Sequence, residues 1–332
     1  MSITLIVLGV LVLGLIVWLL SIDGSYHVKK SLVIGAPKEK VYELVSDYKT
    51  WKSWSPWLCM EPVAKVSITN DGVGVGAVNA WVGDLVGSGE IEHLELKANE
   101  SIQQEIRFIK PFKSKSEVYW QFNDAKGGCE LTWGMKGAMP FFLKFMAKKM
   151  EPWIGMDYER GLKMIKDLIE KGKIDSEVSI EGVSKLDGFK YVGLKETCPM
   201  YEVGPSMKEA FGKINALCEN EKIEPEIAFS IYHKFDFTDP ECTYSSGVPL
   251  ESDIEVSNGF YKSEYPTIKA VKVVFKGDYE HLGNGWASAY SYLRYNKLKA
   301  NKKIDPIELY LNDPTKEQDP ANWLTAIYIP VK

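Results

Sequence analysis

The sequence predicts an α+β protein with three parts: an N-terminal transmembrane helix over residues 1–22, a strand-rich domain over 24–172, and a duplicated domain over 176–332. Three observations lead to this prediction. The first segment is apolar and carries no charge, the middle segment has short strands enclosed by helices, and the last segment repeats one pattern twice. A length of 332 residues suits two folded domains at roughly 100–200 residues each.

The composition is that of a globular protein and excludes some classes of function. Apolar residues make up 45% of the chain and charged residues 26%, which is enough for a buried core. The net charge of −5 argues against nucleic acid as a partner, because phosphate binding needs a basic face. The histidines and cysteines show neither HExxH nor CxxC spacing, so we expect no metal and no cofactor. The odd number of cysteines suggests free thiols in a reducing compartment.

The N-terminal run from Ile3 to Leu20 contains no charged residue. About 20 helical residues cross a hydrocarbon core of roughly 30 Å, which predicts a single-pass membrane anchor. A cleaved signal peptide fits less well, because no Lys or Arg precedes the run and no A-x-A site follows it. Lys29 and Lys30 follow the apolar run, so the expected localisation is a membrane with the body of the protein on the cytoplasmic side.

The middle domain reads as one strand, short helices, a run of strands and a long helix. Residues 25–34 alternate like a half-buried strand, and Val41, Leu44 and Val45 lie at helical spacing. Turn signals then divide residues 63–135 into short strands, and a helical pattern covers 141–171.

The opening strand followed by APKEKVYELVSDYKTWKSWSPW, together with the closing helix, resembles the polyketide cyclase/dehydrase and lipid-transport group of the START-like (SRPBCC) superfamily. The resemblance implies a helix-grip fold, in which a curved antiparallel sheet wraps around the last helix and encloses an apolar cavity. It transfers no catalytic motif. In proteins generally, tryptophans are more often core residues than ligand contacts. The same interpretation is open for the tryptophans of this domain, which are Trp51, Trp54, Trp57, Trp120 and Trp133.

The C-terminal domain repeats one pattern at an offset of 81 residues. Residues 222–225 (KIEP) match 303–306 (KIDP), and Gly204 matches Gly285. A period of this length indicates a duplicated subdomain rather than a solenoid. Each half reads as strand, helix, strand, strand, so we expect a βαββ pair with pseudo-twofold symmetry and a cleft between the halves.

This domain resembles the GyrI-like small-molecule-binding domain, the effector-binding module of multidrug-sensing transcription activators. The resemblance rests on YEVGPSMKEAFGKI, IEPEIAFSIYHKFDFTDP, FKGDYEHLGNGWASAYSYL, IELYLNDP and LTAIYIPVK. It implies that an acid in the penultimate strand points into an aromatic-lined cleft for cationic or polarised aromatic compounds. By position that acid is Glu308, and the predicted cleft walls are Trp286 and Tyr310.

Glu308 is also unusual on its own terms. Strand alternation in residues 307–311 places Glu308 and Tyr310 on one face, and buried charge is costly unless it is paired. The offset aligns Glu308 with Ile227 and Tyr310 with Phe229, so only one half carries the acid. A polar group in an apolar cleft can orient a ligand. The alternative is that Glu308 pairs with a lysine such as Lys303 on an exposed face.

The sequence therefore predicts a membrane-anchored protein that binds hydrophobic or cationic aromatic small molecules in a cleft anchored by Glu308, with a second cavity in the START-like domain. Tyr290 lies one helical turn after Trp286 and can share its face. The predicted ligand-binding residues are Glu308, Trp286, Tyr290, Tyr310 and Phe229. The alternative function is a hydrolase of electrophilic small molecules with Glu308 as the catalytic residue. A transcription regulator is rejected, because no helix-turn-helix pattern precedes residue 176.

Overall fold

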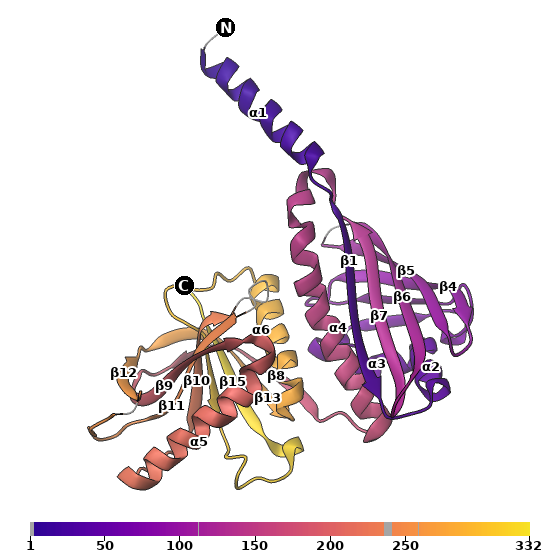
Figure 1. Ribbon diagram of the computed structural model, residues 1–332. Coiled ribbons are helices and arrows are strands. Elements are labelled where there is room, and N and C mark those ends of the chain that lie inside the picture. The colour runs from indigo at the N-terminus through magenta and orange to yellow at the C-terminus, as the bar shows by residue number, and fades with distance from the viewer. Residues whose placement is uncertain (1–2, 112, 236–240, 258) are drawn as a thin grey trace. The chain divides into compact units, whose positions relative to one another are not determined.

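The computed structural model describes residues 3–111, 113–235, 241–257 and 259–332. The chain divides into two compact units (Figure 1). Unit 1 consists of Met1–Ser55, Val63–Gly83 and Gly87–Gly172, and unit 2 of Pro56–Pro62, Asp84–Val86 and Lys173–Lys332.

The N-terminal helix α1 (Ile3–Ser21) corrects the first prediction. It has 19 residues and carries no charge. Within the described part of the chain, no helix is both long and apolar enough to cross a membrane. The predicted transmembrane anchor is therefore wrong.

Unit 1 is an antiparallel sheet with the long helix α4 (Ala147–Glu170) packed along β1 (Figure 1). The strands follow the order β1-β7-β6-β5-β4-β3-β2. Helix α2 (Lys38–Ser46) begins after Pro37 and buries Val41 and Val45, which lie one turn apart. The remaining elements are β1 (Ser25–Ile34), η1 (Tyr48–Thr50), α3 (Trp51–Trp54), β2 (Lys65–Ile68), η3 (Asn70–Gly72), β3 (Val78–Val82), β4 (Ser88–Lys97), β5 (Ser101–Lys110), β6 (Ser114–Ala125), β7 (Gly128–Ala138) and η4 (Phe141–Met146).

Stacked aromatic rings fill the space between the sheet of unit 1 and α4. The ring centroids of Trp133 and Tyr158 are 3.9 Å apart, and those of Trp120 and Trp133 are 4.2 Å apart. Trp54 packs edge-on against both tryptophans of the sheet, with centroids 6.0 Å away. These four side chains are at most 1% exposed. They act as core residues, as proteins generally use large aromatic side chains.

A buried histidine lies next to this aromatic core. His93 donates through Nε2 to the backbone oxygen of Ser46 at 3.0 Å, so its Nδ1 must accept from the Gln104 amide at 3.2 Å. The Gln104 side-chain oxygen in turn accepts from the Trp120 indole at 2.9 Å. Tyr48 stacks on the imidazole with centroids 4.1 Å apart. Burial lowers the pKa of His93 to about 4, and protonation would place two donors face to face.

The buried histidine predicts a loss of stability in mild acid. Because the pKa of His93 falls from 6.5 to about 4 on folding, the unfolded chain binds more protons in that window. We expect the unfolding free energy to drop by about 3 kcal/mol as pH falls from 6.5 to 4. Denaturant unfolding of the wild type and His93→Gln across this window measures the difference.

His27 on β1 supplies the control, since His27→Gln removes another histidine of the same sheet. We expect this variant to keep the acid-sensitive component that His93→Gln loses. An equal pH dependence in the wild type and His93→Gln would contradict the assignment.

Unit 2 is a second antiparallel sheet, with the strand order β12-β9-β11-β10-β14-β15-β13-β8. The order is symmetric about the β10–β14 pair, because β11 and β15, β9 and β13, and β12 and β8 occupy matching places. Each half runs strand, helix, strand, strand, as β9-α5-β10-β11 and β13-α6-β14-β15. The elements are η2 (Leu58–Met60), β8 (Ser176–Leu186), β9 (Phe189–Pro199), η5 (Met200–Glu202), α5 (Val203–Glu221), β10 (Ala228–Phe235), β11 (Glu241–Pro249), β12 (Tyr261–Tyr265), β13 (Ile268–Gly277), η6 (Tyr279–His281), α6 (Gly283–Tyr295), β14 (Ile307–Tyr310), η7 (Pro320–Asn322) and β15 (Leu324–Pro330).

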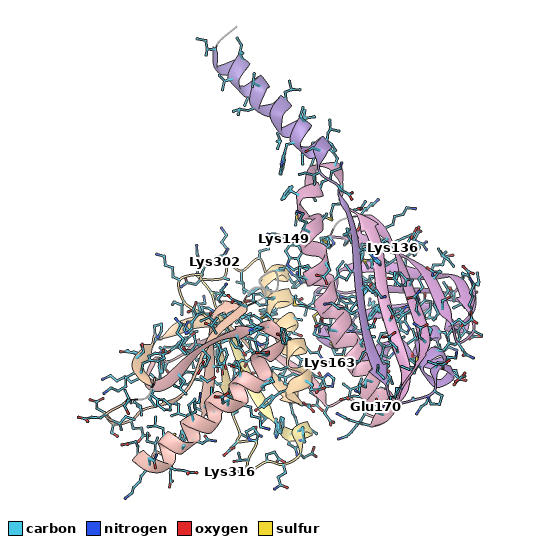
Figure 2. The ribbon with its side chains drawn as sticks, viewed as in Figure 1. Lys136, Lys149, Lys163, Glu170, Lys302 and Lys316 are labelled. Atoms are coloured by element: carbon cyan, nitrogen blue, oxygen red, sulfur yellow. The ribbon has the colours of Figure 1, made fainter. Side chains whose placement is uncertain are left out.

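The two faces of the sheet in unit 2 carry separate apolar clusters. On the helix-covered face, α5 packs on Val192 and Leu194 of β9, while Trp286 and Leu293 of α6 pack on β13 and β15. The opposite face holds a cluster that includes Phe229 and Leu309. Charged side chains such as Lys302 and Lys316 lie at the surface (Figure 2).

The register of the central strand pair corrects the predicted equivalence between the halves. Ser230 lies opposite Glu308, and Phe229 lies opposite Leu309. Ile227 and Phe229 therefore belong to the face opposite Glu308 and Tyr310, because alternate residues of a strand face opposite sides. The offset of 81 thus fails in β10 and β14 by a one-residue slip, which exchanges the two faces.

Candidate functional site

The candidate site of unit 2 is centred on the carboxyl group of Glu308. This residue lies in the short strand β14, between β10 and β15, and it is 1% exposed. Its neighbours Ile307 and Leu309 join the apolar cluster of the opposite face. Strand alternation then directs Glu308 toward the face that α5 and α6 cover.

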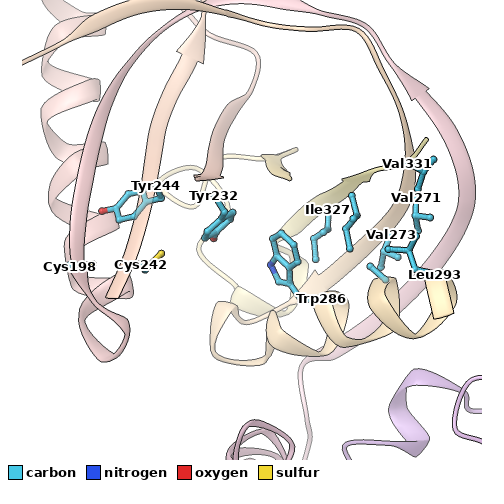
Figure 3. Close-up of a cluster of buried hydrophobic side chains, with 12 residues drawn as sticks. Cys198, Tyr232, Cys242, Tyr244, Val271, Val273, Trp286, Leu293, Ile327 and Val331 are labelled. Carbon is cyan, nitrogen blue, oxygen red and sulfur yellow. The ribbon is translucent and has the colours of Figure 1, made fainter. Parts of the chain in front are cut away.

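Neutral donors surround the carboxyl group. Trp286 on α6 donates its indole N–H to Oε1 at 2.5 Å. Tyr232 on β10 and Tyr310 on β14 donate their hydroxyls to Oε2 at 2.8 and 2.9 Å. Figure 3 shows Tyr232 and Trp286 facing each other from the sheet and the helix, and their rings meet edge to face with centroids 5.3 Å apart.

The carboxyl group has hydrogen bonds but no counter-charge from the described residues. Among the residues that the structure describes, no lysine, arginine or histidine lies within 4.0 Å of its oxygens. Lys303 is exposed at the surface. The alternative interpretation, an exposed ion pair between Glu308 and a nearby lysine, is therefore wrong.

Burial raises the pKa of Glu308 above its ordinary value of 4.5. The hydrogen bonds from Trp286, Tyr232 and Tyr310 favour the ionised form and oppose this shift, but the loss of hydration outweighs them. The tyrosine hydroxyls are affected as well. The pKa of Tyr232 rises because its hydroxyl is buried and lies beside the Glu308 carboxyl group.

A second layer of polar and aromatic side chains supports these donors. The Tyr310 hydroxyl also reaches Ser230 Oγ at 3.1 Å, and Ser230 and Ser246 are joined at 2.8 Å. Around them, Phe235 packs against Tyr232 and Trp286, and Tyr279 packs edge-on against Tyr310. The site is an aromatic enclosure with one acid at its centre.

The structure brings together most of the predicted site residues. Trp286, at 7% exposure, and Tyr310 both contact the Glu308 carboxyl group. Tyr290 stacks on the outer side of Trp286 with centroids 6.2 Å apart, and it is 40% exposed. Phe229 does not take part, because its side chain lies on the opposite face of the sheet with Phe189 and Tyr191.

Sequence reasoning missed one direct contact and one supporting residue. The predicted site residues include neither Tyr232 nor Ser230. Both residues lie two positions apart in β10 and face Glu308. The register between β10 and β14 would have identified them, but strand register is not readable from one sequence.

No metal site competes with this interpretation in the described part of the chain, where no group of three or more His, Cys, Asp or Glu side chains could hold a metal ion. The cysteines Cys129, Cys198, Cys218 and Cys242 are free thiols.

Comparison with protein families identifies both halves of the chain. Residues 182–332 match the model of the GyrI-like small molecule binding domain. Residues 25–170 match the model described as polyketide cyclase/dehydrase and lipid transport. The chain therefore joins a polyketide cyclase/dehydrase and lipid-transport domain to a GyrI-like small-molecule-binding domain, and both predicted resemblances are confirmed.

Similar solved structures each cover about half of the chain. The EcmrR C-terminal domain is 17% identical with a TM-score of 0.40, covering 47% of this chain and 98% of that one. Protein MLL2253 from Mesorhizobium loti is 15% identical with a TM-score of 0.35, covering 45% and 99%. The structure of Ara h 8.0201 is 11% identical with a TM-score of 0.34, covering 45% and 99%. No curated protein matches the chain.

Removing the Glu308 carboxyl group should lower the free energy of unfolding more than replacing it with an uncharged amide. Glu308→Ala leaves the Trp286 and Tyr232 donors buried without their acceptor, so we expect a loss of about 2–5 kcal/mol. Glu308→Gln keeps an oxygen acceptor of similar size, and we expect a change of about 1 kcal/mol or less. Chemical denaturation of both variants at one pH gives the comparison, and equal losses would contradict this hydrogen-bonding pattern.

Proposed function

We propose that unit 2 binds a small cationic aromatic molecule, with the Glu308 carboxylate as its counter-charge. The observation that carries the proposal is a carboxyl group 1% exposed, held by three neutral donors, with no cation paired to it among the described residues. The match to a GyrI-like small molecule binding domain supports the class of ligand-binding protein.

The chemistry of the enclosure favours a cation with an aromatic or otherwise flat body. An ionised carboxylate at low dielectric is strongly disfavoured without an opposite charge, and a ligand cation would supply that charge. Aromatic faces add attraction of about 0.5–2 kcal/mol for each cation–π contact. Trp286 and Tyr232, whose rings meet edge to face beside the acid, are the aromatic side chains that we expect to contact the cation.

We expect a ligand to reach the acid by passing the side chains of Tyr290 and Trp286. Tyr290 is the most exposed of the predicted site residues and stacks on Trp286, which covers the acid. Because the carboxyl group is almost fully buried, a ligand must displace part of this aromatic cover to reach it. Binding should therefore change the environment of Trp286.

A titration with an aromatic cation tests the proposal through tryptophan fluorescence. We expect saturable binding to the wild type, and an affinity lower by about 10- to 100-fold in Glu308→Gln, because one charge-assisted contact is lost. The matched control is Glu264→Gln, which removes the same charge from an exposed position of β12. Equal affinities for the wild type and Glu308→Gln would contradict the role of the acid.

The same titration should depend on pH in a defined direction. The raised pKa means that Glu308 keeps its proton above pH 4.5, and a cation must bind the deprotonated form. We expect the affinity to increase, by up to about tenfold per pH unit, as pH rises toward the raised pKa, and then to level off. A neutral aromatic analogue of the same shape should not show this increase.

The hydrolase alternative draws on the same acid, because a protonated Glu308 beside tyrosine hydroxyls is also a general acid. Incubating the full chain with a panel of epoxides and cyclopropanes tests it. Turnover by the wild type that is lost in Glu308→Gln would favour catalysis at this site. Background turnover by both proteins would leave binding as its function.

A further inference from the structure

A second polar cluster lies on the face of unit 2 opposite Glu308. Ser245 on β11 and His233 on β10 approach within 2.6 Å between Oγ and Nε2. The other ring nitrogen of His233, Nδ1, lies 2.7 Å from a carboxylate oxygen of Asp305. Ser245 is 0% exposed, whereas His233 and Asp305 are partly exposed. The three side chains form one hydrogen-bonded chain of hydroxyl, imidazole and carboxylate.

A β-bulge places His233 in this chain. The register between β10 and β11 shifts between Tyr232 and Lys234, so His233 is the extra, unpaired residue. Bulges of this kind redirect a side chain and are common beside active sites. Strand alternation turns His233 away from the face of Tyr232 and Glu308, and the bulge leaves it without a paired residue in β11.

The backbone before β14 places Asp305. Tyr265 on β12 donates its hydroxyl to the Asp305 backbone oxygen at 2.8 Å. Pro306 follows, and its backbone oxygen accepts from Tyr232 N–H at 3.0 Å. Asp305 is thus fixed on both sides by backbone contacts.

The order of the groups defines their roles. A carboxylate at Nδ1 accepts the ring proton, which leaves Nε2 as an acceptor for the Ser245 hydroxyl proton. A hydroxyl, a base and a group that orients the base, all within hydrogen-bond reach, are the components of an activated nucleophile. Tyr261 donates its own hydroxyl to Ser245 Oγ at 2.6 Å, which agrees with Ser245 directing its proton to His233.

We propose that Ser245, His233 and Asp305 form a second reactive site that transfers the acyl group of small esters. Ser245 Oγ attacks the ester carbonyl carbon, and its proton passes to His233 Nε2. The bond from carbon to the leaving oxygen then breaks, and His233 gives the proton to that oxygen. Water attacks the acyl-serine by the reverse sequence and releases the acid. Ser245 and His233 are the catalytic residues, and Asp305 is a positioning residue.

The surroundings of Ser245 limit the substrate to small acyl groups. Ser245 has no exposed surface, so an ester reaches it only after side chains around it move. Tyr261 belongs to the short strand β12, which stands at one end of the strand order and pairs with β9 (Figure 1). Its hydroxyl is the nearest side-chain donor to Oγ and is placed to bond a carbonyl oxygen that gains negative charge.

The test uses the full chain, p-nitrophenyl acetate and a small fluorophosphonate. Intact-mass measurement and peptide mapping should find one adduct per chain, on Ser245. The acylation rate should fall by about 100-fold or more in His233→Gln, as expected for loss of a general base. It should also fall in Asp305→Asn, where Ser245 and His233 are both retained, and no adduct should form at position 245 in Ser245→Ala.

Thr243→Ala is the matched control. Thr243 is a hydroxyl residue on the same strand, two positions from Ser245, and it pairs with Thr197 rather than with a histidine. Its variant should react like the wild type. Peptide mapping of the wild type decides the question even if a variant fails to fold. No adduct on Ser245, or the same acylation rate in folded His233→Gln, would overturn the proposal.

Discussion

The structure of unit 2 depends on one interaction, the burial of the Glu308 carboxyl group among neutral donors. Burial raises the pKa of this carboxyl group, because no described residue supplies a paired positive charge. Each surrounding donor must therefore point its hydrogen at a carboxyl oxygen. Trp286 joins α6 to the acid by a hydrogen bond, and Tyr232 and Tyr310 join the two central strands to it in the same way. The acid therefore links the helix to the sheet. Its negative charge, when ionised, has no paired cation among the described residues, and a cationic ligand could supply one.

The pseudo-twofold arrangement explains why such a site can exist at this place. Strands β10 and β14 pair at the centre of the sheet, and α5 and α6 cover the same face on either side of that pair. The two strands are not equivalent in sequence, so the acid occurs once. Ser230 lies opposite it and connects through Tyr310 to the same network.

The same two segments supply residues to both faces of the sheet. Strand alternation separates Tyr232, which faces the acid, from His233, which faces Ser245, and a bulge leaves His233 unpaired in the ladder. Asp305 and Glu308 are three residues apart and join different clusters. In unit 1, by contrast, the aromatic stack on α4 is continuous, and its polar members such as His93 are held inside hydrogen-bonded networks.

Much of this architecture could be predicted from the sequence, and the failures have identifiable causes. Strand alternation puts Glu308 and Tyr310 on one face, and helical spacing puts Tyr290 beside Trp286, as the structure has them. The constant offset of 81 misplaced Phe229, because a slip of one residue in one strand pair exchanges faces without changing the rest of the repeat. The apolar content of the first segment suggested a span, but no helix of the described residues is long and apolar enough to make one. The Ser245–His233–Asp305 chain depends on a bulge and on register, neither of which a single sequence displays.

The central claim is that Glu308 is a buried acid that no described residue pairs with a positive charge. Carbon-13 NMR of glutamate side-chain carboxyl groups, recorded across pH with Glu308→Gln to assign the signal, measures its titration directly. We predict a midpoint above 4.5 in the ligand-free protein. A midpoint at or below 4.5 would contradict the account, because it would mean that the carboxylate is already compensated in the folded chain.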